Sequence, residues 1–324
     1  MSIFRIFLLT PLALIGLGAL ALGGLIAAPL SHPPLLASIQ TTARAADRSG
    51  MPPVSRFKAR DGAELAYRYY APKGPSAGRI AILAHGSSAL GAAMHTLAAA
   101  LAEQGVAAYA PDMRGHGQSG PRGDIAYIGQ LEDDLADLTA LIRKSDASSP
   151  ITLIGHSAGG GFALRVAASP IQDLFARTIL LAPYLGYDAP TSRENSGGWA
   201  SPDIARIIGI SVLERLGIGC CGGLPVLAFA VGPDAKELTG VYSYRMLKNY
   251  AVHGDYRADL AAATRPITIY SGAEDELMFA DEYADAMRGA GAKPDVRLIA
   301  DLNHMAIVSD AGAVARIAAD VAGK

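Results

Sequence analysis

Ser157 stands between two glycines in the pentapeptide Gly155-His156-Ser157-Ala158-Gly159, directly after the apolar run 151–154. Such a serine is typical of a sharp turn from a strand into a helix, which holds the hydroxyl exposed in a strained backbone conformation. Both flanking glycines have a steric reason, because a Cβ there would clash with the crowded backbone. The pattern predicts that Ser157 is a nucleophile. A glycine-rich turn with an idle serine is the alternative.

A serine hydroxyl is a weak nucleophile at neutral pH, so it needs a histidine base whose tautomer is fixed by an acid. On a strand–turn–helix of this kind the partners follow the serine in the order acid, then histidine. Only His253 and His304 follow Ser157. We predict that His304 is the base, because it comes directly after the apolar run 296–299, whereas His253 precedes the expected acid.

The acid is expected directly after the apolar run 267–270, where Glu274, Asp275 and Glu276 offer three carboxylates. We predict that Asp275 is the acid. Glu274 and Glu276 are expected to point elsewhere on the turn and to cap the helix that begins near residue 279. A shift of the acid to Glu274 stays open.

Two backbone N–H groups are candidates to stabilise a tetrahedral oxyanion. Ser87 lies in the turn His85-Gly86-Ser87, which follows the run 80–84, and its N–H is the first. The N–H of Ala158 is the second, because the residue after the nucleophile begins a helix whose dipole favours negative charge. Together such donors stabilise an oxyanion by a few kcal/mol.

Two further histidines lie near these motifs. His116 belongs to the segment Asp112-Met113-Arg114-Gly115-His116-Gly117-Gln118-Ser119, which precedes the nucleophile. We interpret this segment as a hydrogen-bonded structural loop held by Asp112 and Arg114. His156 is expected to pack inside the turn and not to act as a base.

Six short apolar runs alternate with helix-like segments, after a two-strand hairpin signal around Asp61-Gly62. The runs are 80–84, 106–110, 151–154, 178–182, 267–270 and 296–299, and the helix-like segments include 92–104, 131–144 and 280–288. This alternation predicts the α/β class: a mostly parallel sheet with helices on both faces.

The alternation predicts one α/β core over residues 54–183 and 264–324. Residues 184–263 interrupt it over a length that no ordinary connection needs. Apolar residues at helical spacing occur there, namely Ile204, Ile207, Ile208, Val212, Leu213 and Leu216. We expect an inserted helical cap over the mouth of the site.

Residues 6–30 are nearly all apolar and follow Arg5. The segment exceeds the roughly 7–15 residues of a signal-peptide core and reaches the ~20 that span a bilayer. Residues 1–30 therefore predict an uncleaved membrane anchor, with a cleaved signal as the alternative. Arg5 favours an N-terminus in the cytoplasm and a catalytic domain outside it, or secretion after cleavage. Residues 31–53 are expected to be a linker.

Composition limits the remaining classes. The chain has 324 residues, 51% of them hydrophobic, and a net charge of −2, which gives nucleic acid no basic surface to bind. Cys220 and Cys221 are adjacent and are the only cysteines, so a long-range intrachain disulfide is excluded. We expect two reduced, buried thiols without a metal, with a vicinal disulfide as the alternative.

Four motifs together make the chain resemble the α/β-hydrolase superfamily, and within it the lysophospholipase, monoacylglycerol lipase and serine aminopeptidase-like group. They are His85-Gly86, the segment 112–119, the pentapeptide 155–159, and Gly272-Ala273-Glu274-Asp275 with His304. The resemblance runs from about residue 54 to 324 and is weakest through the cap. It implies a triad of Ser157, Asp275 and His304, with Ser87 and Ala158 as oxyanion donors.

These observations predict a carboxylic ester hydrolase that works through an acyl-enzyme, without a metal or an organic cofactor. An apolar cap near a membrane favours acylglycerols, lysophospholipids or similar apolar acyl esters as substrates. Amide, peptide or thioester cleavage and perhydrolysis on the same triad are alternatives. A non-catalytic, membrane-tethered binding protein and a protein that docks partners through its cap are two more. The sequence leaves the oligomeric state open.

Overall fold

The computed structural model describes residues 3–324, and their side chains except those of residues 3–13, 15, 43 and 44. An eight-stranded sheet forms the centre, in the order β1-β2-β4-β3-β5-β6-β10-β11. Its strands are β1 (Ser55–Lys58), β2 (Glu64–Tyr70), β3 (Ile80–Ala84), β4 (Ala107–Pro111), β5 (Ile151–His156), β6 (Arg177–Leu181), β10 (Ile267–Gly272) and β11 (Val296–Ile299).

The sheet is antiparallel only at its start. β2 pairs antiparallel with both β1 and β4, and every later pair is parallel. This arrangement confirms the predicted mostly parallel sheet. In the register, Ala84 of β3 pairs with Gly155 of β5, and His156 pairs with Leu181 of β6. The loops that leave the carboxyl ends of these strands therefore meet at one edge of the sheet, where ligands bind in open α/β sheets.

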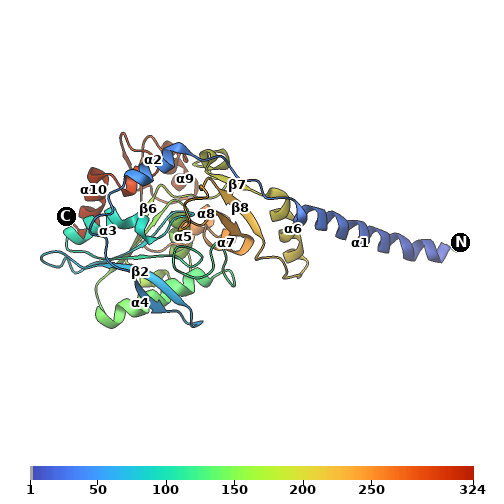
Figure 1. Ribbon diagram of the computed structural model, residues 1–324, viewed down its shortest axis with the longest axis horizontal. Coiled ribbons are helices and arrows are strands. Elements are labelled where there is room, and N and C mark those ends of the chain that lie inside the picture. The colour runs from blue at the N-terminus through green and yellow to red at the C-terminus, as the bar shows by residue number, and fades with distance from the viewer. Residues whose placement is uncertain (1–2) are drawn as a thin grey trace.

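Helices cover both faces of the sheet (Figure 1). On one face lie α3 (His95–Glu103) and α10 (Ala311–Ala322), which pack against each other. On the other lie α4 (Gln130–Ser145), α5 (Ala158–Ala167) and α9 (Tyr283–Gly289). Short 3₁₀ turns, Gly91–Met94 and Ala280–Glu282, lead into α3 and α9. The central strands are apolar without alternation because both of their faces are buried.

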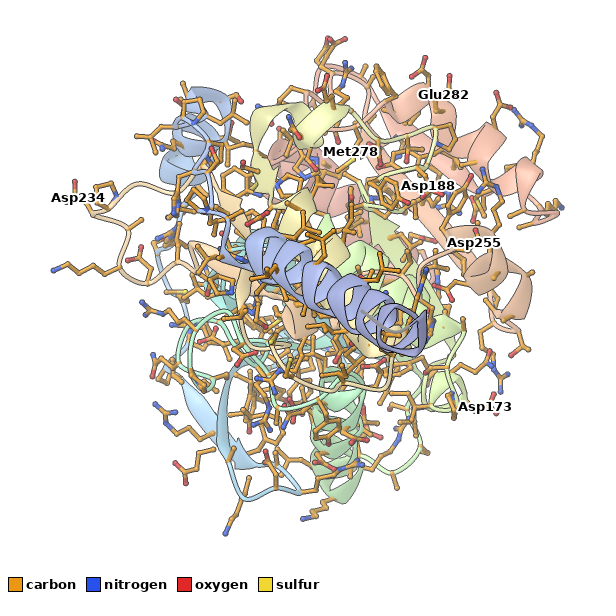
Figure 2. All side chains as sticks on the ribbon, turned by 90° about the vertical axis from the view of Figure 1, so that its right-hand side faces the viewer. Asp173, Asp188, Asp234, Asp255, Met278 and Glu282 are labelled. Carbon is orange, nitrogen blue, oxygen red and sulfur yellow. The ribbon has the colours of Figure 1, made fainter. Side chains whose placement is uncertain are left out.

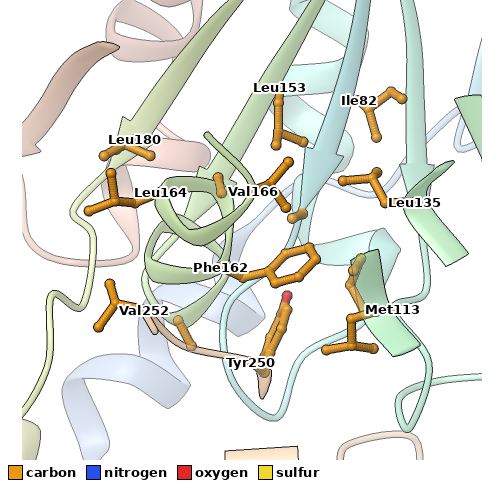
Figure 3. Close-up of a cluster of buried hydrophobic side chains, with 14 of the residues drawn as sticks. Ile82, Met113, Leu135, Leu153, Phe162, Leu164, Val166, Leu180, Tyr250 and Val252 are labelled. Carbon is orange, nitrogen blue, oxygen red and sulfur yellow. The ribbon is translucent and has the colours of Figure 1, made fainter. Parts of the chain in front are cut away.

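The core beneath the helix α5 is close-packed (Figure 3). Phe162 is fully buried, and its ring centroid lies 5.5 Å from that of Tyr250. Ile82 and Leu153 from the sheet belong to the same cluster. Since α5 begins directly after Ser157, this packing fixes the helix that carries the candidate nucleophile.

The cap segment, residues 184–263, contains the helices α6 (Ile204–Arg215), α7 (Tyr244–Asn249) and α8 (Tyr256–Ala262). It also contains a three-stranded antiparallel sheet of β7 (Ala200–Pro202), β8 (Pro225–Phe229) and β9 (Val241–Ser243), which the sequence did not predict. Strands of three to five residues are too short to show a clear alternation, so the helical spacing in 204–216 dominated the pattern.

The N-terminal helix α1 (Ile3–Ala27) projects away from the rest of the molecule, and its last turns lie beside α6 (Figure 1). In the part of the chain that is described, no helix combines the length and the apolarity needed to cross a membrane. The anchor predicted over residues 1–30 is therefore not supported here. It falls in part on residues 1–2 and on side chains outside the description.

The expected linker, residues 31–53, packs against the body of the molecule. It contains the helix α2 (Ala37–Ala45), in which Ile39 is buried. Asn303 Nδ2 donates a 3.0 Å hydrogen bond to Thr42 Oγ1, and His95 Nε2 donates one of 3.0 Å to the Ser49 carbonyl. The polar composition of this segment reflects surface packing and not free extension.

Phe162→Ala is expected to lower the free energy of unfolding by about 3–5 kcal/mol, because it leaves a cavity between α5 and the sheet. Urea unfolding followed by circular dichroism measures the change. Leu174→Ala is the control, since Leu174 is 37% exposed and its loss should cost less than about 0.5 kcal/mol. Equal effects of the two substitutions would show that the cluster under α5 does not stabilise the fold.

Candidate active site

Ser157 lies on the turn between β5 and α5 with φ 55° and ψ −119°, a conformation that non-glycine residues rarely adopt. A Cβ at Gly155 would overlap the Gly159 carbonyl, and a Cβ at Gly159 would overlap the His85 carbonyl. The two glycines are thus required by the close approach of the backbone around the turn. Ser157 itself is 7% exposed.

Asp275 and His304 come from the loops after β10 and β11 and are both buried. His304 Nδ1 lies 2.8 Å from Asp275 Oδ2. The other carboxylate oxygen, Oδ1, accepts hydrogen bonds from the N–H groups of Leu277 (2.8 Å) and Met278 (2.9 Å). Every oxygen of this carboxylate therefore has a donor, and the imidazole is held in one orientation.

The pKa of Asp275 is the balance of opposing effects. Burial alone would raise it, but the nearby His304 and the hydrogen bonds to the carboxylate outweigh burial and lower the pKa below its ordinary value of 3.8. Asp275 is therefore ionised at neutral pH. A charged carboxylate on Nδ1 is what an imidazole needs to accept a proton at its other nitrogen.

Glu276 holds the backbone of the same loop. Its Oε2 accepts a 2.9 Å hydrogen bond from the N–H of His304, so it positions this residue and does not cap a helix as the sequence suggested. The neighbouring Glu274 is exposed. Among the three candidate carboxylates, the structure brings only Asp275 to the imidazole of His304.

His156 connects the turn of Ser157 to the loop of His304. Its Nε2 lies 3.1 Å from the His304 carbonyl, and the two rings are 4.9 Å apart. Burial, and then the neighbouring His304, lower the pKa of His156 to about 3. The neutral ring therefore donates its Nε2–H to the carbonyl, a structural role of the kind expected for His156, although the sequence pattern did not reveal this partner.

The loop after β3 lies against the turn of Ser157. A Cβ built at Gly86 would lie 3.3 Å from the Cβ of Ser157, a contact tighter than most real ones. Ser87 follows, and in the described part of the chain its N–H has no protein acceptor. Ala158 opens α5, so its N–H is one of the unpaired groups of the first helical turn. Both predicted donors border Ser157.

The remaining candidates have other partners. Asp112 Oδ1 accepts from the Gly91 N–H and Oδ2 from the Gln118 N–H, which holds the loop 112–119 as expected. His116 is buried and bonded to Tyr242, and His253 pairs with Asp259 at 2.7 Å. Neither His116 nor His253 contacts Asp275.

The vicinal thiols differ from the expectation of buried residues. Cys220 is exposed, Cys221 is half-buried, and both are free, with their Sγ atoms 2.7 Å apart. Within the described residues, no group of three or more His, Cys, Asp or Glu side chains is placed to hold a metal ion.

His156→Gln should reduce the pH dependence of stability between about pH 6.5 and 3. In this range the unfolded histidine, with its ordinary pKa of 6.5, binds a proton that the folded residue rejects. The free energy of unfolding of the parent therefore falls as the pH falls, by up to about 1.4 kcal/mol per pH unit for this residue. Urea unfolding at several pH values compares how steeply the free energy of unfolding falls in the parent and in the variant. Identical slopes would mean that His156 becomes charged as readily in the folded protein as in the unfolded one.

Comparison with known proteins agrees with this geometry. A family model described as serine aminopeptidase, S33, matches residues 75–211. Lipase LipV of Mycobacterium tuberculosis is 33% identical over 141 residues, which cover 43% of this chain and 50% of LipV. A monoacylglycerol lipase of Mycolicibacterium smegmatis is 30% identical over 101 residues, covering 31% of this chain and 36% of that protein. The matched region thus spans half or less of these relatives.

The fold is shared over nearly the whole chain with one solved structure. The crystal structure of a membrane phospholipase A, described as a bacterial virulence factor, superposes with a TM-score of 0.57 at 16% identity, covering 98% of this chain and 97% of the other. The sheet, the strained serine turn and these likenesses show that the chain has the α/β-hydrolase fold, and part of it is similar to a lipase and a monoacylglycerol lipase.

Proposed function

We propose that the protein is a serine hydrolase that cleaves carboxylic esters. The observation that carries this proposal is the buried Asp275–His304 pair, joined at 2.8 Å on loops that leave the same edge of the sheet as Ser157. A strained serine turn, an oriented histidine and an ionised acid are the parts that acyl transfer requires.

In the proposed reaction, Ser157 Oγ attacks the ester carbonyl while His304 Nε2 takes the hydroxyl proton. The charge on the imidazolium is stabilised by Asp275, and the oxyanion accepts hydrogen bonds from the N–H groups of Ser87 and Ala158. The C–O bond to the alcohol breaks, His304 returns the proton to the leaving oxygen, and an acyl ester of Ser157 remains. Water, deprotonated by His304, then releases the acid and restores Ser157.

We propose esters with an apolar acyl chain, such as acylglycerols or lysophospholipids, as the substrate class. The relatives described as lipase and monoacylglycerol lipase support this class. The cap segment supports it too, because the apolar side chains of Ile204 and Ile208 lie exposed on α6. A peptidase is the second candidate, since the matching family model carries the description of a serine aminopeptidase.

Ser157→Ala in the 324-residue chain should lower hydrolysis of chromogenic esters by at least about 10³-fold while the fold stays intact. Asp275→Asn should lower turnover by up to about 10⁴-fold, because it removes the charge that fixes the tautomer of His304. The assay compares esters of graded acyl length, and the optimum length reports the size of the acyl site.

His253→Gln is the matched control, because this histidine also pairs with an aspartate but lies 40% exposed and away from Asp275. It should keep the activity of the parent. Loss of activity in His253→Gln together with its retention in His304→Gln would overturn the assignment of the base. A folded parent that cleaves peptides but no ester would favour the second candidate.

We also propose that α1 associates with a membrane and that the catalytic domain lies outside the cytoplasm. The described side chains of Leu14, Leu17 and Leu20 are between 64% and 76% exposed, as expected of a surface that meets lipid. Figure 2 looks onto the face that bears α1, where Asp234, Asp173 and Glu282 lie toward the outline and Asp188 lies farther in. The full-length likeness to a membrane phospholipase A also supports this proposal.

Leu17→Glu combined with Leu20→Glu should shift the protein from the membrane to the soluble fraction. Each substitution replaces an apolar side chain that meets lipid with a carboxylate, and moving a carboxylate from water into an apolar medium is unfavourable. Flotation with lipid vesicles measures the partition, and Leu174→Glu is the control on an exposed leucine outside α1. Protease treatment of intact cells tests the orientation. Flotation of the double variant like the parent would refute association through α1.

A further inference from the structure

The loop after β3 is held from the side of the cap. The Ser88 N–H donates a 3.1 Å hydrogen bond to Tyr242 Oη, and the Thr239 N–H donates one of 2.9 Å to the Ser88 carbonyl. Ser88 Oγ in turn donates to the Thr239 carbonyl. Trp199 Nε1 donates a 2.9 Å hydrogen bond to Ser87 Oγ. All of these partners come from the cap segment.

The three cap residues that make these contacts lie in, or just before, the strands of one small sheet. Trp199 directly precedes β7, Thr239 precedes β9, and Tyr242 lies within β9. Phe229, at the end of β8, packs between the two aromatic rings, with centroid distances of 5.9 Å to Trp199 and 4.7 Å to Tyr242. Because β8 pairs with both neighbours, Trp199 and Tyr242 are fixed relative to each other.

His116 fixes the hydroxyl of Tyr242. The Nδ1 of His116 faces the carbonyls of Met113 and Arg114, so it carries the proton and leaves Nε2 as an acceptor. Tyr242 Oη donates its one proton to this Nε2 at 2.5 Å, and its oxygen accepts the hydrogen bond from the Ser88 N–H. Burial lowers the pKa of His116 and raises that of Tyr242, so both stay neutral.

The conformation of the loop depends on these contacts. Ser88 has φ 66°, in the left-handed region that a serine occupies only when its surroundings hold it there. Ser87, one residue before it, carries the N–H that we assign to the oxyanion. Gly86, two residues before it, packs against Ser157. A shift of Ser88 would therefore move the oxyanion donor relative to the nucleophile.

We propose that the small cap sheet, through Tyr242 and Trp199, positions the oxyanion loop for catalysis. Tyr242 and Trp199 are positioning residues, since neither contacts the reacting atoms. The proposal rests on the ester hydrolysis proposed above and extends it: the cap sheet is part of the machinery that stabilises the transition state, in addition to covering the site. Substrate binding is not expected to depend on these two residues.

The test compares Tyr242→Phe and Trp199→Phe with the parent, using kcat and KM for a short-chain ester. A second readout is the affinity for an alkyl trifluoromethyl ketone, because its adduct with Ser157 places an oxyanion in the same hole. We expect kcat to fall about tenfold or more in each variant, with KM changed by less than about threefold. Affinity for the ketone should weaken by the same factor as kcat.

Tyr70→Phe is the matched control. Tyr70 is also a buried tyrosine bonded to a histidine, with Oη 3.0 Å from His95 Nδ1, but it lies on the other face of the sheet. It should keep both kcat and ketone affinity, even if its melting temperature falls as far as that of Tyr242→Phe. Should Tyr242→Phe fail to fold, the half-buried Trp199 provides the decisive variant.

Three outcomes would overturn the proposal: unchanged kcat in Tyr242→Phe and Trp199→Phe, a rise in KM without loss of kcat, or equal losses in Tyr70→Phe. Each of these requires a parent that hydrolyses the ester. A parent without activity contradicts the proposed function itself, so the two failures are distinguishable.

Discussion

The backbone of Ser157 is strained, and the surrounding structure has to hold it. A conformation of this kind costs on the order of 1–3 kcal/mol. The Ser157 N–H donates to the Leu181 carbonyl of β6, and the Ser157 carbonyl accepts from the N–H groups of Gly160, Gly161 and Tyr184. The turn is thus bonded to the neighbouring strand, to its own helix and to the start of the cap segment. This one constraint explains why Gly155 and Gly159 flank the serine, and why the loop after β3 approaches Ser157 through Gly86.

Environment separates the histidines near the turn into different roles. His85, His116 and His156 are all buried, and burial lowers the pKa of each below its ordinary value. They remain neutral and act as hydrogen-bonding parts of the scaffold. His304 is buried as well, but it alone of these four has a carboxylate at hydrogen-bonding distance from its ring. The ring of His304 is therefore paired with an acid, whereas the rings of the other three form hydrogen bonds only with neutral groups.

The strands and the residues directly after them could be predicted because the signal is local. Apolar runs locate the strands of the large sheet, and parallel pairing then places residues such as Ser157, Asp275 and His304 at one edge. The small cap sheet and the packing of α2 were missed because their strands and contacts carry no periodic pattern. Tyr242, Trp199 and His156 were missed for another reason. Each acts through a partner more than 110 residues away, and no spacing in the sequence indicates such a pair.

The cap segment forms hydrogen bonds to two parts of the chain that are far from it in sequence. On one side its sheet holds the loop of Ser88. On the other, the guanidinium of the buried Arg206 in α6 donates to the carbonyls of Ile26 and Ala28 at the end of α1, and to that of Pro225 at the start of β8. The last carbonyls of a helix lack partners within it, so this single side chain closes α1 and attaches it to the cap. Displacing α1 relative to α6 would break charged hydrogen bonds or move β8. The end of the N-terminal helix and the small cap sheet are therefore fixed to each other through Arg206.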